Sequence, residues 1–220
     1  MKDTTSTTRP RRKLSRERVL AAALRLADQE GIDAVSMRRL GQALGVEAMS
    51  LYRHVSGKED ILDGIADLVM EEVEVPNRDV PWQTALRQSA VSTHLALLRH
   101  PWASAVLESR RNPGPTRLRY LDTVVSILLG AGFTLPDVAR AFMAVDSHVY
   151  GFTLQVVAMP FDLRDAPEEA ARMASETFGD AYPGLRAMAG LAATGPGVPI
   201  ELEFGLDLII DGLERRLAGA

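Results

Sequence analysis

The sequence predicts an all-α fold of about nine to ten helices, arranged as an N-terminal three-helix domain and a larger C-terminal helical domain. Two observations support this class. Apolar residues recur at spacings of three and four, as at Met37, Leu40 and Leu44. Each such segment begins after a residue that can cap a helix and ends at a residue that can stop one. Ser36 and Gly45 have these two roles around residues 37–44.

The first predicted helix runs from Ser15 to Glu30. Ser15 can cap its first turn, Glu17 lies beside the positive end of the helix dipole, and Gly31 ends it. Residues 1–14 contain almost no apolar side chains, so we expect a disordered basic arm there. Such an arm can follow a DNA backbone or enter a minor groove, and a simple solvated charge run explains the same residues.

The stretch 36–62 predicts a helix, a tight turn, a second short helix and the start of a third. Gly45 accepts the left-handed backbone that the turn needs, because it has no Cβ. The second helix begins at Glu47 or Ala48 and spans about two turns, which is too short to be stable alone. It therefore has to be braced by its neighbours.

Leu51 and Val55, four residues apart, are the expected bracing side of this second helix. Its other side carries hydrogen-bond donors and no carboxylate, on the residues Met49, Ser50, Tyr52, Arg53 and His54. A short braced helix with this chemistry fits the helix-turn-helix solution for reading a DNA major groove. An ordinary helical hairpin is the alternative interpretation.

Residues 15–75 resemble the DNA-binding domain of the tetracycline-repressor (TetR) family. The resemblance is carried by the first helix with its glycine break, the Gly45-Val46 turn, the segment Leu51-Tyr52-Arg53-His54-Val55, and Gly57-Lys58-Glu59 at the start of a long fourth helix. It implies a DNA-binding set made of Ser36, Arg38, Ala48, Met49, Ser50, Tyr52, His54 and Lys58.

Within this set the resemblance implies two roles. Arg38, Tyr52, His54 and Lys58 would hold the DNA backbone and neighbouring bases, and residues 48–50 would face base edges. Ala48 and Met49 are apolar, so at those positions we expect contact with a thymine methyl group instead of a hydrogen bond.

Charge is distributed unevenly along the chain. The net charge is −4, but residues 1–60 hold 12 Lys plus Arg against 8 Asp plus Glu, and residues 61–220 hold 13 against 21. The first part is thus at +4 and the second at −8. Such asymmetry favours end-on binding to nucleic acid, although acidic surfaces are common and need no function.

Several classes of protein are disfavoured by what the sequence lacks. It has no cysteine, which excludes disulfides and thiolate metal sites. It shows no apolar run of about eighteen residues and no signal peptide, so we expect a cytoplasmic protein with no membrane association. It contains no nucleophile-elbow, phosphate-loop or HExxH motif, so we expect no catalysis, cofactor or metal.

We expect the division into arm, DNA-binding domain and second domain to fall at 1–14, 15–60 and 61–220. The fourth helix, ended by Pro76, would link the last two. Further helices are predicted over 82–99, after Pro101, over 115–130, from Pro136 and over 201–217. Proline and glycine interrupt residues 160–198, which leaves one short helix from 167 to 178 and a mobile loop.

The second domain resembles, more loosely, that of the tetracycline-repressor branch, through PWQTALRQ, LLGAGFTLPDVARAFMAVDSHVYGFTL and FGLDLIIDGLERRL. The resemblance implies a ligand-binding and dimerising domain. The branch holds its drug through magnesium and two histidines, which align with Leu107 and Glu74 here, so we expect neither tetracycline nor a metal chelate as ligand.

Candidate effector-binding residues are the polar and aromatic side chains on otherwise apolar helices, namely His94, Trp102, Arg110, His148, Phe152 and Gln155. Hydrogen-bonded structural roles are the competing interpretation for the histidines. The terminal helix carries a wide apolar face around Gly205, Leu208 and Gly212. We expect it to pair with the helix after Pro136 in a four-helix homodimer interface, and packing within its own chain is the alternative.

These observations together predict a sequence-specific DNA-binding transcriptional regulator, a repressor released from a palindromic operator by a small-molecule effector. The expected partners are double-stranded operator DNA, that effector and a second copy of the chain. Two alternatives stay open at this point. One is a DNA-binding activator without a ligand, and the other is a helical small-molecule-binding protein that does not regulate DNA.

Overall fold

The computed structural model describes residues 13–110, 113–158, 172–173, 176–178, 181–194 and 201–219. Across these ranges the regular structure is helical, with no strand, which confirms the predicted all-α class. None of the helices within them is long and apolar enough to cross a membrane.

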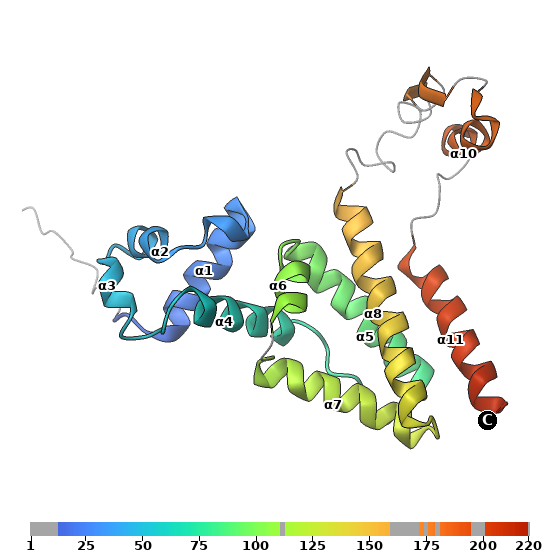
Figure 1. Ribbon diagram of the computed structural model, residues 1–220, viewed down its shortest axis with the longest axis horizontal. Coiled ribbons are helices and arrows are strands. Elements are labelled where there is room, and N and C mark those ends of the chain that lie inside the picture. The colour runs from blue at the N-terminus through green and yellow to red at the C-terminus, as the bar shows by residue number, and fades with distance from the viewer. Residues whose placement is uncertain are drawn as a thin grey trace, which may run out of the picture. The chain divides into compact units, whose positions relative to one another are not determined.

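Two compact units make up the chain (Figure 1). Unit 1 contains Met1–Glu72 and Trp102–Leu118, and unit 2 contains Val73–Pro101 and Arg119–Ala220. The whole fourth helix therefore packs with unit 1, whereas the sequence placed residues from 61 onward in the second domain. These units are defined by packing, whereas the predicted boundary at residue 60 separates functions, and that boundary stays a prediction.

Unit 1 is built from α1 (Arg16–Glu30), the 3₁₀ turn η1 (Ile32–Ala34), α2 (Met37–Leu44), α3 (Ala48–Leu51), α4 (Lys58–Glu71), α6 (Ala103–Ser109) and the start of α7 (Pro115–Gly130). The predicted caps are confirmed. The Oγ atoms of Ser15 and Ser36 accept hydrogen bonds from the backbone N–H groups of Arg18 and Arg39, at 3.4 and 3.3 Å.

Four helix packings hold the described part of unit 1 together: α1 on α2, α2 on α3, α1 on α4, and α4 on α6. Apolar side chains of α1, α2 and α4 are fully buried in this unit, such as Val19 on α1, Leu40 on α2 and Ile61 on α4. α4 ends at Glu71, five residues before the predicted stop at Pro76. The core of unit 1 is completed only by α6, which comes from beyond that proline.

Unit 2 is built from α5 (Trp82–Arg99), most of α7, α8 (Leu135–Ala158), α10 (Pro183–Thr194) and α11 (Leu202–Ala218). α5, α8 and α11 pack on one another. On α11, Leu202, Leu206, Ile210 and Leu213 are buried. α11 thus packs on α8 within one chain, and the predicted four-helix interface between two copies stays a prediction.

The region 160–198 differs in part from its prediction. Residues 183–194 form the helix α10, which the sequence did not predict because Gly184 and Gly190 interrupt the pattern. A proline at the first helical position explains why the helix starts at Pro183. Of the predicted helix 167–178, residues 172–173 and 176–178 are helical, and the rest lies outside the described residues.

Asp137 connects the first turn of α8 to the last turn of α11. Its Oδ1 accepts hydrogen bonds from Arg216 Nε at 2.6 Å and from Arg140 Nη1 at 2.9 Å. The hydroxyl of Thr134 and these two guanidinium groups lower the pKa of this carboxyl to about 2. The carboxylate is therefore charged at any physiological pH, and it fixes the register between α8 and α11.

Candidate DNA interface and effector site

The turn between α2 and α3 depends on two glycines. Gly45 adopts φ 66° and ψ 37°, the left-handed conformation that the sequence predicted. Gly41 lies where α2 meets the start of α3, and a Cβ placed on it would be 2.8 Å from the Val46 carbonyl oxygen and 3.2 Å from the Ala48 nitrogen. The backbone of the turn therefore packs directly on α2, which fixes the direction of α3.

α3 is a four-residue helix, Ala48–Leu51, followed by turn residues 52–54. It is shorter than the predicted two turns, since its regular hydrogen bonding stops at Leu51. Leu51 and Val55 are buried, which confirms the predicted bracing side. Burial of these two side chains holds in place a helix that could not persist by itself.

The opposite side of α3 faces outward. Met49 is 75% exposed and Tyr52 is 49% exposed, and both are large side chains that a protein normally buries. Ala48, Ser50 and His54 are half-buried beside them. This side combines an apolar thioether, a hydroxyl, a phenol and an imidazole on one short rigid segment.

The helices before and after α3 each carry an exposed cationic side chain. Arg38 on α2 and Lys58 at the first position of α4 are exposed. Neither side chain makes a hydrogen bond or ion pair with the described part of the chain, whereas the adjacent Arg39 is paired with Glu30 at 2.5 Å. α4 also begins without a side-chain cap at Gly57, so its first N–H groups can bind an anion.

Of the predicted DNA-binding residues, Ser36 has a structural role as the cap of α2. Arg38, residues 48–54 and Lys58 all belong to unit 1, whose helices α2, α3 and α4 are drawn in Figure 1. The assignment of these residues to DNA contact stays a prediction.

Three of the predicted effector residues form a cluster in unit 2. Phe152 on α8 lies between two histidines, with ring centroids 5.5 Å from His94 and 5.9 Å from His148. His94 Nδ1 is 2.7 Å from the Thr153 hydroxyl, and His148 Nε2 is 2.8 Å from the Leu202 carbonyl oxygen. The cluster thus joins α5 to α8, and α8 to the start of α11.

The hydrogen bonds of the cluster determine which ring nitrogens carry protons. Thr153 donates its only hydroxyl proton to the Val149 carbonyl at 2.6 Å, so its oxygen can only accept from His94 Nδ1–H. His148 must donate from Nε2 because a carbonyl only accepts. Burial lowers the pKa of His94, which favours the neutral ring with Nε2 as a free acceptor position.

The other predicted effector residues lie elsewhere. Trp102 and Arg110 belong to unit 1, where Trp102 Nε1 donates to Asp28 Oδ1 at 2.8 Å and Arg110 pairs with Glu59 and Asp63. Gln155 is exposed on α8. Trp102 and Arg110 therefore have carboxylate partners within unit 1. The six predicted effector residues do not form one site.

Sequence reasoning missed a set of buried hydroxyl groups in unit 2. Ser89 Oγ lies 2.7 Å from Tyr120 OH, and burial raises the pKa of that phenol. Thr93, one turn after Ser89, donates to the Ser89 carbonyl at 2.9 Å. Hydroxyl residues spaced by four on an apolar helix were the available signal, but satisfied hydroxyls of this kind also occur in ordinary cores.

A cavity of about 400 Å³ opens at another place in unit 2, lined by Arg78, Val80, Trp82, Ser126, Ile127, Gly130 and Ala131. It contains none of the predicted effector residues. Trp82, on its wall, packs edge-to-face on Phe133 with centroids 5.1 Å apart. The described residues hold no group of three or more histidine, aspartate or glutamate side chains that could bind a metal.

Comparisons with known proteins agree with this architecture. Residues 19–65 match the family described as bacterial regulatory proteins, tetR family, and residues 75–217 match the tetracyclin repressor-like C-terminal domain. The chain is 33% identical to the transcriptional repressor DrrR1 of Streptomyces coeruleorubidus over 95% of its own length and 80% of that protein. It is 30% identical to the Escherichia coli tetracycline repressor of class C, covering 92% of both.

Among solved structures, ActR of Streptomyces coelicolor in complex with actinorhodin superimposes with a TM-score of 0.74 at 26% identity, covering 93% of this chain and 99% of ActR. The two matched regions span both halves of the sequence, and the relatives cover almost its full length. The chain therefore belongs to the TetR family of bacterial transcriptional regulators, with an N-terminal helix-turn-helix domain and a tetracycline-repressor-like C-terminal domain.

Proposed function

We propose that the protein is a repressor that binds a palindromic operator as a homodimer and leaves it when a small-molecule effector binds. One observation carries the DNA half of this proposal. The outward side of α3, with Met49 and Tyr52 exposed, is flanked by Arg38 and Lys58, whose charges no described residue neutralises. Unneutralised cations beside a braced recognition helix suit phosphates on either side of a major groove.

Within this proposal Lys58 binds a phosphate together with the free N–H groups at the start of α4. Arg38 holds a second phosphate, and residues 48–54 contact base edges. The named relatives support repression, since DrrR1 and the tetracycline repressors are described as repressors.

The effector half is supported by the cluster of His94, Phe152 and His148. When neutral, the two rings present His94 Nε2 and His148 Nδ1 as hydrogen-bond acceptors on either side of an aromatic ring. We propose that the effector is an aromatic molecule that carries hydrogen-bond donors. ActR has been solved with actinorhodin bound, which makes that compound a reasonable first probe.

Lys58→Gln tests the DNA contact. Each phosphate contact contributes about 0.9 to the slope of log affinity against log salt, so losing one per subunit should lower the slope of a dimer by about two. Binding should weaken equally on an operator duplex selected from random sequence and on its scrambled version. Fluorescence anisotropy across a salt series measures both quantities.

Arg140→Gln is the matched control, because it removes the same charge from α8. An unchanged salt slope for Lys58→Gln would contradict the assignment of this residue. The same assay tests the effector half: actinorhodin at saturating concentration should release the duplex. If actinorhodin bound the protein, as judged by a raised melting temperature, and left DNA affinity unchanged, binding and release would not be coupled in the way proposed.

A further inference from the structure

The first turns of α4 carry acidic residues at the end where a phosphate would bind. Glu59 and Asp60 follow Lys58 directly, and Asp63 lies one turn further along. Unpaired carboxylates so close to a phosphate would oppose its binding, because they lie within the screening length of about 8 Å at physiological salt. The charge on these acids therefore affects how well this end of α4 binds DNA.

Asp60 is neutralised from within the helix-turn-helix region. Arg16, the first residue of α1, forms two bonds with it, Nη2 to Oδ1 at 2.7 Å and Nη1 to Oδ2 at 2.9 Å. The carboxylate also accepts the backbone N–H of Ser56 at 2.7 Å. These bonds lower the pKa of Asp60, with the Arg16 hydrogen bond as the largest cause.

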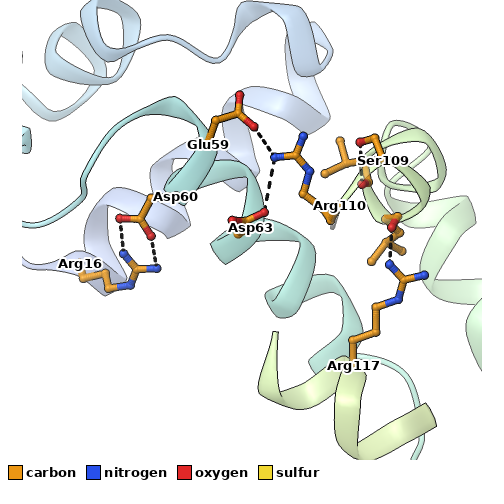
Figure 2. Close-up of polar contacts among 9 residues, drawn as sticks. Arg16, Glu59, Asp60, Asp63, Ser109, Arg110 and Arg117 are labelled. Atoms are coloured by element: carbon orange, nitrogen blue, oxygen red, sulfur yellow. Dashed lines mark hydrogen bonds and ion pairs between the residues drawn. The ribbon is translucent and has the colours of Figure 1, made fainter. Parts of the chain in front are cut away.

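Glu59 and Asp63 share one cation, supplied by a residue far away in sequence, which offsets half of their charge. Arg110, directly after α6, places Nη1 at 2.6 Å from Glu59 Oε2 and at 3.4 Å from Asp63 Oδ1. Figure 2 shows this guanidinium beside the two carboxylates, and the Arg16–Asp60 pair on another side of α4, to the left. One cation thus serves two acids.

Arg110 is more buried than the acids with which it pairs. Its side chain is 17% exposed, while that of Glu59 is 75% exposed. Its Nε is buried and makes no hydrogen bond among the described residues. The carboxylates of Glu59 and Asp63 remain open to solvent, so the strength of these ion pairs depends on salt.

The start of α7 is hydrogen-bonded to α4. Asp67, which continues the spacing of four from Glu59 and Asp63, accepts hydrogen bonds from the Thr116 backbone N–H and hydroxyl, both at 3.1 Å. It also accepts the Arg117 backbone N–H at 3.3 Å. Asp67 on α4 thus caps the first turn of α7.

We propose that Arg110 raises DNA affinity by neutralising Glu59 and Asp63, so that the N-terminal end of α4 can accept a phosphate at Lys58. Arg110 is thus a positioning residue for DNA binding, although it lies outside the helix-turn-helix sequence. The inference rests on the proposed phosphate contact of Lys58. It adds a separate prediction: loss of Arg110 lowers DNA affinity because the carboxylates of Glu59 and Asp63 are left without their cation.

Arg110→Gln in the full-length protein tests the proposal. Freeing two partly exposed carboxylates should weaken binding about three- to fivefold at low salt, equally on the selected operator duplex and on its scrambled version. The difference from wild type should shrink as salt is added. Arg140→Gln, which removes the same net charge from unit 2, should bind as wild type does.

The rescue variant separates charge from folding. Adding Glu59→Gln and Asp63→Asn to Arg110→Gln removes both unpaired carboxylates and leaves each subunit one charge more positive than wild type, so affinity should return to at least the wild-type value. An unaltered affinity of Arg110→Gln would overturn the proposal, and so would a loss that the two added changes do not rescue. Failure of the wild-type protein to bind either duplex would instead overturn the proposed function.

Discussion

Leu208→Glu is expected to convert the dimer into a monomer and to weaken operator binding by at least about a hundredfold, because a monomer makes contact with one half-site only. Leu208 is 59% exposed on α11 and Phe204, one turn earlier, is 70% exposed. The buried residues of α11 lie on its other side. A large apolar surface on a terminal helix indicates a partner.

α8 supplies the second half of this predicted interface. Met143 and Leu154 on that helix are each 64% exposed, while Val145 and Val149 point into unit 2. Two such helices from each subunit can form a four-helix interface about a two-fold axis. A glutamate at position 208 would then be buried against apolar side chains without a cation to pair with it.

Analytical ultracentrifugation of wild type and Leu208→Glu, together with anisotropy on the operator duplex, measures both effects. Leu129→Glu is the matched control, since Leu129 is an exposed leucine on α7. It should remain dimeric. A Leu208→Glu protein that sedimented as a dimer and bound DNA normally would place the interface on other helices.

Gly41→Ala is expected to weaken specific operator binding by at least about tenfold. The added Cβ would lie 2.8 Å from the Val46 carbonyl oxygen, and the atoms that it meets are backbone, which cannot rotate away. Overpacking of this kind costs about 1–3 kcal/mol, and the strain is relieved by moving α3 away from α2. Binding to the scrambled duplex, which depends on phosphates and not on base edges, should change much less.

Gly130→Ala is the control for this substitution. Gly130 ends α7, and a Cβ on it would meet nothing within 4 Å. Thermal unfolding by circular dichroism would show that Gly41→Ala remains folded at the temperature of the binding assay. Equal losses on operator and scrambled DNA would contradict the claim that Gly41 sets the direction of the recognition helix.

The helix-turn-helix could be predicted from sequence because its signals are local. Ser15 and Ser36 cap helices that begin within a residue of them, and Gly45 has the left-handed backbone that only a glycine takes without strain. The bracing residues Leu51 and Val55 follow from helical spacing alone. Each of these features depends on neighbours fewer than five residues away.

The effector candidates could not be sorted from sequence because their partners are distant. Trp102 is bound by Asp28 and Arg110 by Glu59, contacts that span 74 and 51 residues. His94 meets Thr153 across 59 residues. Only the folded chain shows that the histidines join one cluster in unit 2, while Trp102 and Arg110 belong to unit 1.

The central claim is that a dimer reads a palindrome with two copies of α3, and in vitro selection of bound duplexes from a random pool tests it most directly. We predict an inverted repeat whose half-site centres lie about 10 base pairs apart, or a small multiple of that, since two recognition helices must enter major grooves on one side of the DNA. Tyr52→Ala should fail to enrich this repeat. Enrichment of no sequence by the wild-type protein, or of a single unrepeated site, would contradict the account.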